Sequence, residues 1–247
     1  MRNTLITPLL FGLVALGLWQ AVAVLCAMPE YLLPAPLAIL ASVDRDLFLQ
    51  LGVTFSEALA GFAIASLLAF GAALLFVRFP TLERGLFPIA IAVKTTPIIA
   101  IAPLLVLWQG TGWWSKITAA GLICFFPVLV NVVKGLKSVD ADFRDLFRSF
   151  GASPAQEFRK LRLPFCLPYL FSALKISSSL AVVGAIVGEF VGATKGLGYL
   201  IMISAAHLET ATLFSAVFAS ALAGIMLFYA INTVERLVVF WHSADVE

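Results

Sequence analysis

The sequence predicts an all-α, polytopic membrane protein with six transmembrane helices. Of its 247 residues, 62% are hydrophobic and only 12% are charged, whereas soluble domains carry roughly 25% charged residues. The mean hydropathy of +1.03 leaves too little polar sequence to give most elements a solvated face. Six stretches are apolar enough to cross a bilayer, which takes about 20 residues each. We therefore expect a single transmembrane domain over residues 1–247.

The first two predicted spans cover residues 8–28 and 57–77. No charge occurs between Arg2 and Glu30. This apolar stretch is longer than the core of a secretory signal, which has about 7–15 residues, so we expect a retained helix rather than a cleaved signal. The second span is uncharged from Ala58 onward.

The third predicted span, residues 87–108, is the most irregular of the six. It is interrupted by Lys94 and contains Pro97 and Pro103. Each proline removes one backbone hydrogen bond from a helix. Such prolines are tolerated in a membrane where neighbouring groups satisfy the freed carbonyls.

The last three spans are expected at residues 115–134, 166–191 and 211–235. The fifth span contains Lys175 and carries glycines at four-residue spacing from Gly184 onward. Stripes of small residues let helices approach one another closely. The fifth span should therefore pack tightly against a neighbour.

The distribution of lysine and arginine predicts that both termini are cytoplasmic. With the N-terminus inside, eleven basic residues fall in cytoplasmic segments and three fall outside, namely Arg45, Lys116 and Lys195. Lys94 and Lys175 lie within spans. The net charge of +2 gives no reason to expect a nucleic-acid partner.

One cytoplasmic connection, residues 135–165, concentrates charge in a chain that otherwise has little. Its first half carries apolar residues at three- and four-residue spacing, which predicts a helix with an apolar stripe made by Phe143, Leu146, Phe147 and Phe150. Gly151 can end this helix in the left-handed conformation.

The second half of the same connection carries the signals of a short helix from about residue 154 to residue 161. Ser153 is a plausible N-cap, Pro154 suits the first helical position, and Gln156 completes the spacing of a capping box. Pro164 then leads back into the membrane. We expect this pair of helices to dock onto a cytoplasmic partner, with an ordinary interfacial hairpin as the alternative.

The spacing within this connection matches a known signature. ABC importer permeases carry E-A-A, three residues, G, nine residues and I-x-L-P between two late spans, and the chain resembles them at every spacing. The matching residues are Asp145, Leu146 and Phe147, then Gly151, Ala152 and Ser153, then Leu161, Leu163 and Pro164. The departures are Asp for Glu, Leu-Phe for Ala-Ala, and Leu for Ile.

Two further segments extend the resemblance over nearly the whole chain. The run from Pro97 to Gly112 is similar to a third-span segment of nitrate/sulfonate/taurine-type permeases, a group that includes transporters of thiamine precursors and riboflavin. Gly188-Glu189-Phe190, followed by the run from Gly196 to Ile201, is similar to the same group. The resemblance implies a type I ABC importer permease fold in a bacterial inner membrane. It also implies that residues around 145–164 form a coupling helix seated in a cleft of an ATPase subunit.

The resemblance further implies an assembly of two permease subunits, two ATPase subunits and an external solute-binding protein. A homodimer is the simplest way to build a pathway from one six-span chain. The chain contains no Gly-Lys dipeptide and so lacks the usual phosphate cradle for ATP. We therefore expect no enzymatic activity and no cofactor on this chain, with ATP and Mg²⁺ bound by the ATPase.

Charges inside a bilayer are costly, so each is a candidate for the translocation pathway of a small anionic or vitamin-precursor solute. Lys94 is followed by two threonines, and its alternative is to snorkel to the interface. For Lys175, the alternative is a structural ion pair. For Glu189, the alternative is an ordinary carboxylate at the membrane interface.

A membrane-embedded enzyme and an assembly factor are the competing functions. The sequence contains neither H-E-x-x-H nor G-x-S-x-G, and its two histidines, His207 and His242, fall on opposite sides of the predicted membrane. The cysteines lack metal-ligand spacing. We expect Cys26, Cys124 and Cys166 to be packing residues.

Overall fold

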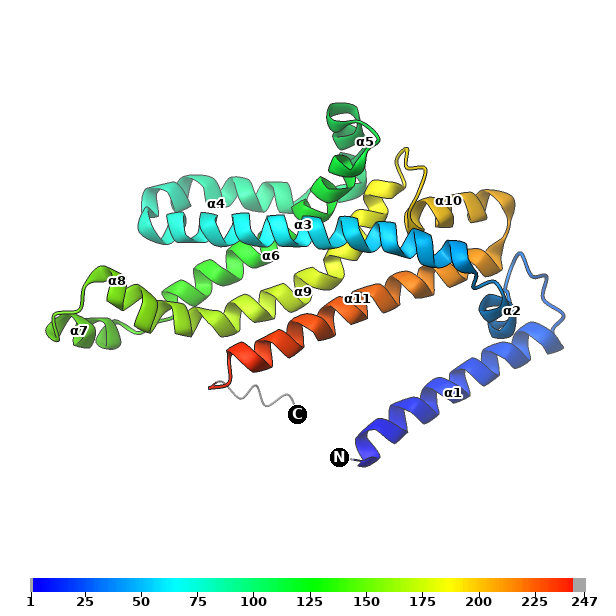
Figure 1. Cartoon of the computed structure of the whole chain (residues 1–247), viewed down its shortest axis with the longest axis horizontal. Coiled ribbons are helices and arrows are strands. Elements are labelled where there is room, and N and C mark those ends of the chain that lie inside the picture. Colours follow the sequence, from blue (N-terminus) through cyan, green and yellow to red (C-terminus); the bar gives the residue numbers. More distant parts are fainter. Residues whose placement is uncertain (1, 242–247) are drawn as a thin grey trace.

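The computed structural model describes residues 2–241, which form helices joined by short connections (Figure 1). Met1 and residues 242–247, with the predicted cytoplasmic His242, lie outside the described residues. The helices are α1 (Arg2–Leu25), α2 (Pro36–Ala41), α3 (Arg45–Arg78), α4 (Pro80–Thr95), α5 (Ile98–Gln109), α6 (Trp113–Lys137), α7 (Ala141–Ser149), α8 (Pro154–Glu157), a π-helical turn (Phe158–Arg162), α9 (Leu163–Glu189), α10 (Leu197–His207) and α11 (Thr210–Val238). The all-α prediction is confirmed for the described residues.

Within residues 2–241, four helical runs are long and apolar enough to cross a membrane: α3, α6, the run from α8 through α9, and α11. A fifth span exists if α4 and α5 count as one, although the pair bends by 100°. The first predicted span falls on α1, where Leu9–Leu25 forms a shorter apolar helix. The structure therefore supports four or five spans by length and composition, against six predicted.

Helix α3 begins twelve residues before the predicted start of the second span. The Asp44 side chain caps it by accepting a hydrogen bond from the Leu47 N–H over 2.9 Å. The prediction rested on the apolar run and so covered only the apolar part of the helix. Because the helix starts at the Asp44 cap, it has 34 residues in all. At about 1.5 Å per residue, α3 is longer than the hydrocarbon core, so its N-terminal turns extend beyond it or the helix tilts.

Helix α6 lies between α3 and α9 and packs against both through glycine and alanine. A Cβ on Gly61 of α3 would lie 2.6 Å from the Ile117 carbonyl oxygen of α6. A Cβ on Gly184 of α9 would lie 2.6 Å from the Ala120 Cα. The glycine-rich fifth span, α9, therefore packs closely against α6, as predicted. The contacts of α6 with α3 and α9 form the centre of the bundle.

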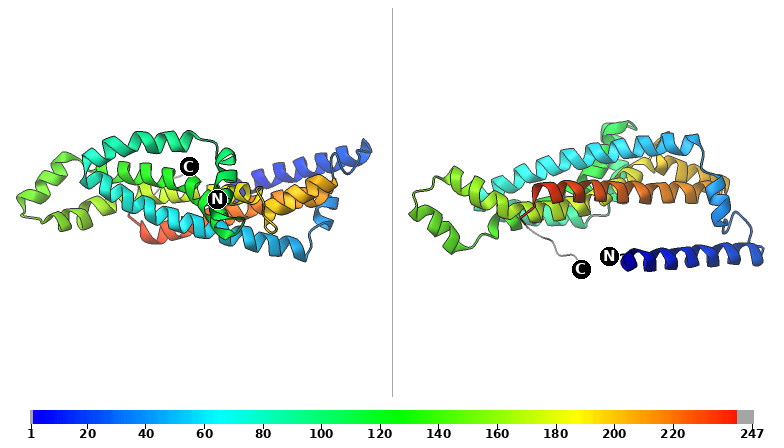
Figure 2. Two further views of the ribbon diagram at one scale, coloured as in Figure 1. Left: turned by 90° about the horizontal axis from the view of Figure 1, so that it is seen from above. Right: turned by 60° about the horizontal axis from the view of Figure 1, so that its bottom comes forward.

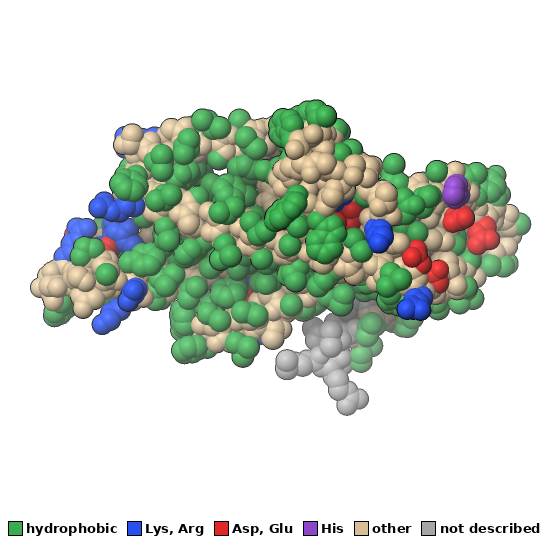
Figure 3. Space-filling model, turned by 45° about the horizontal axis from the view of Figure 1, so that its top comes forward, with side chains coloured by type: hydrophobic (Ala, Val, Ile, Leu, Met, Phe, Trp, Pro, Cys, Tyr) green, Lys and Arg blue, Asp and Glu red, His purple; other side chains and the backbone are tan. Residues whose placement is uncertain are grey.

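Helix α1 runs beside the bundle and stands apart from it over most of its length (Figures 1 and 2). The indole of Trp19 approaches the ring of Phe214 on α11 with centroids 5.6 Å apart. Many large apolar side chains of α1 are exposed, including Phe11 at 71%. Apolar surface also covers most of the face shown in Figure 3, as expected for a protein solvated by lipid.

Candidate functional site

The connection between α6 and α9 folds as two helices joined by a glycine turn, as predicted. Asp140 caps α7 by accepting a hydrogen bond from the Ala141 N–H over 2.8 Å. Gly151 follows α7 with φ of 71°, in the left-handed region that favours glycine. The chain can therefore reverse between α7 and α8 without strain.

The capping box of α8 is present in full. The Gln156 N–H donates to Ser153 Oγ over 3.3 Å, and the Ser153 N–H donates to Gln156 Oε1 over 2.8 Å. Pro154 occupies the first helical turn, where its missing N–H costs nothing. The predicted short helix ends at Glu157 and continues as a π-helical turn.

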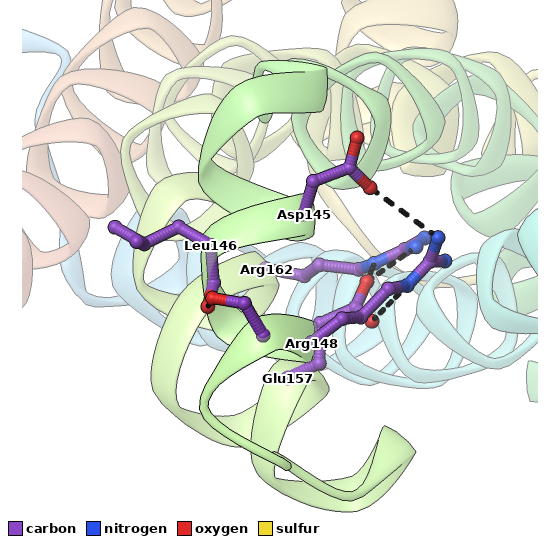
Figure 4. A network of polar contacts seen from close by, with 6 residues as sticks. Asp145, Leu146, Arg148, Glu157 and Arg162 are labelled. Carbon is purple, nitrogen blue, oxygen red and sulfur yellow. Dashed lines mark hydrogen bonds and ion pairs between the residues drawn. The ribbon is translucent and has the colours of Figure 1, made fainter.

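A buried carboxylate joins the two short helices to the base of α9 (Figure 4). Glu157 is 8% exposed. Its Oε1 accepts from Arg162 Nη2 over 2.7 Å, and its Oε2 lies 3.8 Å from Arg148 Nε on α7. Arg148 also lies 3.5 Å from Asp145. Because one carboxylate holds two arginines from different elements, α7 and α8 should move together with α9.

The outer side of α7 presents large apolar side chains that the described residues leave at least half exposed, although the ring of Phe143 lies 6.3 Å from that of Phe165. Phe143 and Leu146 are each 50% exposed, and Phe150 is 82% exposed. Phe147 is half-buried. Helix α7, which carries this exposed set of Phe143, Leu146 and Phe150, lies at the end of the molecule where lysine and arginine gather (Figures 1 and 3). It suits contact with another protein.

The predicted coupling residues divide between this exposed side and the base of the segment. Asp145, Gly151 and Ser153 are exposed, and Ala152 is half-buried. Leu161 is buried, while Leu163 and Pro164 are half-buried where the segment enters the bundle. The π-helical turn lies directly before Pro164, and there the Leu163 N–H donates to the Phe158 carbonyl.

The third predicted span breaks at Thr96, between α4 and α5. The hydroxyls of Thr95 and Thr96 donate to the Ala92 carbonyl over 2.8 and 3.3 Å. Pro97 precedes α5. A cavity of about 320 Å³ opens at the break and is lined by Lys94, both threonines and side chains of α6. Lys94 is exposed in the single chain.

Lys175 is paired. Its Nζ lies 2.6 Å from Glu235 Oε2 of α11, and the two side chains are 18% and 15% exposed. This contact joins α9 to α11 and favours the structural-pairing alternative for Lys175.

Glu189 is 1% exposed and belongs to a buried polar cluster rather than to an interface. Its Oε1 accepts from the Thr54 hydroxyl over 2.7 Å, and its Oε2 accepts from the Gly198 N–H over 2.5 Å. The pattern of glycines around 196–198 is thereby explained, because a Cβ on Gly198 would lie 2.7 Å from the Glu189 Cβ.

Two members of this cluster were missed by sequence reasoning. Glu57 on α3 is 3% exposed, and Lys116 on α6 is 2% exposed. Each was placed at the edge or outside of a predicted span. The available signal was their common depth: Glu57 and Lys116 start their predicted spans and Glu189 lies near the end of its own, which places all three near the predicted outer side.

Comparison with known proteins identifies transport permeases as relatives of this chain. Residues 61–246 match the family described as binding-protein-dependent transport system inner membrane component. The formylaminopyrimidine transport permease protein ThiX of Halalkalibacterium halodurans is 35% identical over 96% of both chains. The riboflavin transport system permease protein RibX of Chloroflexus aurantiacus is 34% identical over 92% of this chain and 86% of its own.

The fold is also similar to a solved structure. A chain of the MetNI methionine ABC transporter in an inward-facing conformation superposes with a TM-score of 0.61, at 22% identity, over 78% of this chain and 94% of that one. The predicted type I importer permease fold is thus confirmed. The predicted resemblance to nitrate/sulfonate/taurine-type permeases is confirmed as well.

Proposed function

Because this chain belongs to the family of binding-protein-dependent transport system inner membrane components, we propose that two copies of it form the solute pathway of an ATP-driven importer. The chain is a multi-pass inner-membrane permease subunit of an ABC importer, and we expect no enzymatic activity on it. The proposed partners are an ATPase dimer, which binds ATP and Mg²⁺, and an external solute-binding protein.

The observation that carries the coupling role is the exposed apolar set on α7. Phe143, Leu146 and Phe150 would be exposed to water on the cytoplasmic side without a partner, which is unfavourable by about 25 cal/mol per Å² of apolar surface. A cleft in an ATPase subunit would bury them. Closure of the ATPase dimer would then displace α7 and α8 and, through Glu157, shift α9 as a rigid body.

The proposed orientation places α7, α8 and both termini in the cytoplasm. The gathering of lysine and arginine at the α7 end supports it (Figure 3), because cytoplasmic segments of membrane proteins are enriched in these residues.

The proposed pathway passes the break between α4 and α5. Discontinuous helices in transporters place polar groups and a helix N-terminus at the solute. Here Lys94, Thr95 and Thr96 line the cavity at that break. An exposed lysine facing lipid would be costly, whereas one facing an aqueous pathway shared with a second copy would not. The absence of any buried residue in α4 supports a partner on this side.

The proposed solute is small and is either anionic or a vitamin precursor. Lys94 supports an anionic group on the solute. The relatives named for formylaminopyrimidine and riboflavin support the vitamin-precursor class. Inhibition of uptake by unlabelled compounds of the two classes would separate them.

Co-purification with the ATPase tests the proposed coupling site. Phe150→Ala removes the most exposed apolar side chain of the set and should release the ATPase from detergent-solubilised complexes. Leu82→Ala, at a 39% exposed leucine near the start of α4, is the matched control and should leave the ATPase bound. Equal retention by both variants would contradict the assignment.

A further inference from the structure

Three ionisable side chains are buried together at the end of the bundle opposite α7 and α8. They are Glu57 of α3, Lys116 of α6 and Glu189 of α9, and each is at most 3% exposed. Buried charges cost several kcal/mol each unless they are paired and hydrogen-bonded. Two carboxyl groups beside one ammonium would leave one negative charge uncompensated.

Hydrogen-bond donors are divided unequally between the two carboxyl groups. Both oxygens of Glu189 accept from donors, namely the Thr54 hydroxyl and the Gly198 N–H. By contrast, Oε2 of Glu57 is buried and has no hydrogen-bond partner within the described residues. An unpartnered oxygen costs less on a neutral acid than on a carboxylate.

Glu57 lies one helical turn after Thr54 on α3, and so on the side of α3 from which Thr54 donates to Glu189. An ionised carboxylate can only accept hydrogen bonds, so two of them cannot bond without a proton between them. The proton belongs on Glu57, because Glu189 already uses both of its oxygens as acceptors. With Glu57 neutral, Glu189 negative and Lys116 positive, the net charge of the cluster is zero.

Glu189 also lies where a negative charge is favoured. Three successive N–H groups at the start of α10 donate to side chains of other helices: Gly196 to Gln50 Oε1 over 2.6 Å, Leu197 to Thr54 Oγ1 over 2.7 Å, and Gly198 to Glu189. The N-terminus of a helix carries partial positive charge. The cluster therefore caps α10 from α3 and α9.

We propose that Glu57 and Glu189 bind one proton, carried on Glu57, so that Glu189 stays ionised and, together with Thr54, anchors α10 to α9 and α3. Gly196 makes the anchor possible, since its φ is 105° and a Cβ there would lie 2.6 Å from Glu189 Oε2. The proposal concerns a buried proton site and does not depend on which solute is transported.

Two glutamine substitutions in the full permease–ATPase complex distinguish the roles of the carboxyl groups. Glu57→Gln keeps a neutral group that can still donate to Glu189, so the thermal midpoint should stay at the wild-type value. Glu189→Gln removes the charge and puts an NH₂ group among donors, so the midpoint should fall by roughly 5 °C. A fall for Glu57→Gln as large as that for Glu189→Gln would overturn the proposal.

Infrared spectroscopy tests the proton directly. The wild-type complex should show the C=O absorption of a protonated carboxyl group, and Glu57→Gln should remove one such band. An unchanged band in Glu57→Gln would overturn the assignment. If Glu189→Gln fails to assemble, the midpoint and the spectrum of Glu57→Gln decide the question alone.

Discussion

Arg162 contacts a single oxygen of Glu157 with two of its nitrogens. Nε donates to Glu157 Oε1 over 2.9 Å, and Nη2 donates to the same oxygen over 2.7 Å. Glu157 ends α8, and Arg162 ends the π-helical turn that leads into α9. The pair therefore fixes α8 to the start of α9, which is the connection that the proposed coupling to an ATPase requires.

Loss of the Glu157 charge should uncouple the ATPase from transport. In Glu157→Gln, Arg162 loses its charged partner and Arg148 keeps only Asp145, so solute-stimulated ATP hydrolysis in reconstituted vesicles should fall several-fold while membrane insertion is retained. Glu83→Gln is the control, because it breaks a 2.6 Å ion pair with Lys137 at the end of α6, before the coupling helices at residues 145–164. Equal effects of the two variants would show that Glu157 has no special place in coupling.

The turn between α7 and α8 should require a residue that tolerates positive φ. A Cβ on Gly151 would meet no atom within 4 Å, so Gly151→Val acts through backbone strain, about 1–2 kcal/mol for a left-handed residue. We expect it to abolish solute stimulation of ATP hydrolysis. Gly151→Asn should retain most of it, since asparagine is enriched in this conformation. Full stimulation in the valine variant would refute the requirement.

Removal of the Lys94 charge should weaken transport of an anionic solute. The loss of one hydrogen bond to a charged group, about 1.5–3 kcal/mol, corresponds to a rise in KM of roughly 10- to 100-fold for Lys94→Met. Lys94→Arg should retain uptake, and Lys195→Met, at an exposed lysine near the other end of the bundle, is a control. Uptake by Lys94→Met equal to wild type would instead indicate a snorkelling lysine.

A double-mutant cycle separates the two roles considered for Lys175. If the pair with Glu235 is structural, Lys175→Met leaves a poorly solvated carboxylate and should destabilise the protein by up to about 3 kcal/mol. The double variant with Glu235→Gln should recover most of the thermal midpoint, and uptake should recover with it. Loss of uptake in the double variant despite a restored midpoint would place Lys175 in the pathway.

Local structure in the coupling segment could be predicted from the sequence because each signal acts over a few residues. Ser153, Pro154 and Gln156 specify a helix start by their own hydrogen bonds, and Gly151 specifies a turn by its backbone freedom. None of these depends on which helices are neighbours. The third span was instead predicted to run through both prolines, whereas the helix breaks before Pro97 and continues through Pro103.

The buried cluster around Glu189 could not be predicted, because it joins residues that are far apart in the sequence. Thr54 and Gly198 are 144 residues apart, yet both donate to Glu189. The apolar pattern gives the depth of a residue in the membrane but not the direction in which its side chain faces. Glu57 and Lys116 therefore read as charges at the ends of spans, and only the packing of α3, α6 and α9 brings them together.

The most direct test is photo-crosslinking from α7. A photoreactive residue introduced at Leu146, in cells that also produce the ATPase, should yield a covalent permease–ATPase product, and the same residue at Leu107 of α5 should not. A product from position 107 with none from position 146 would contradict the assignment of α7 and α8 as the ATPase contact.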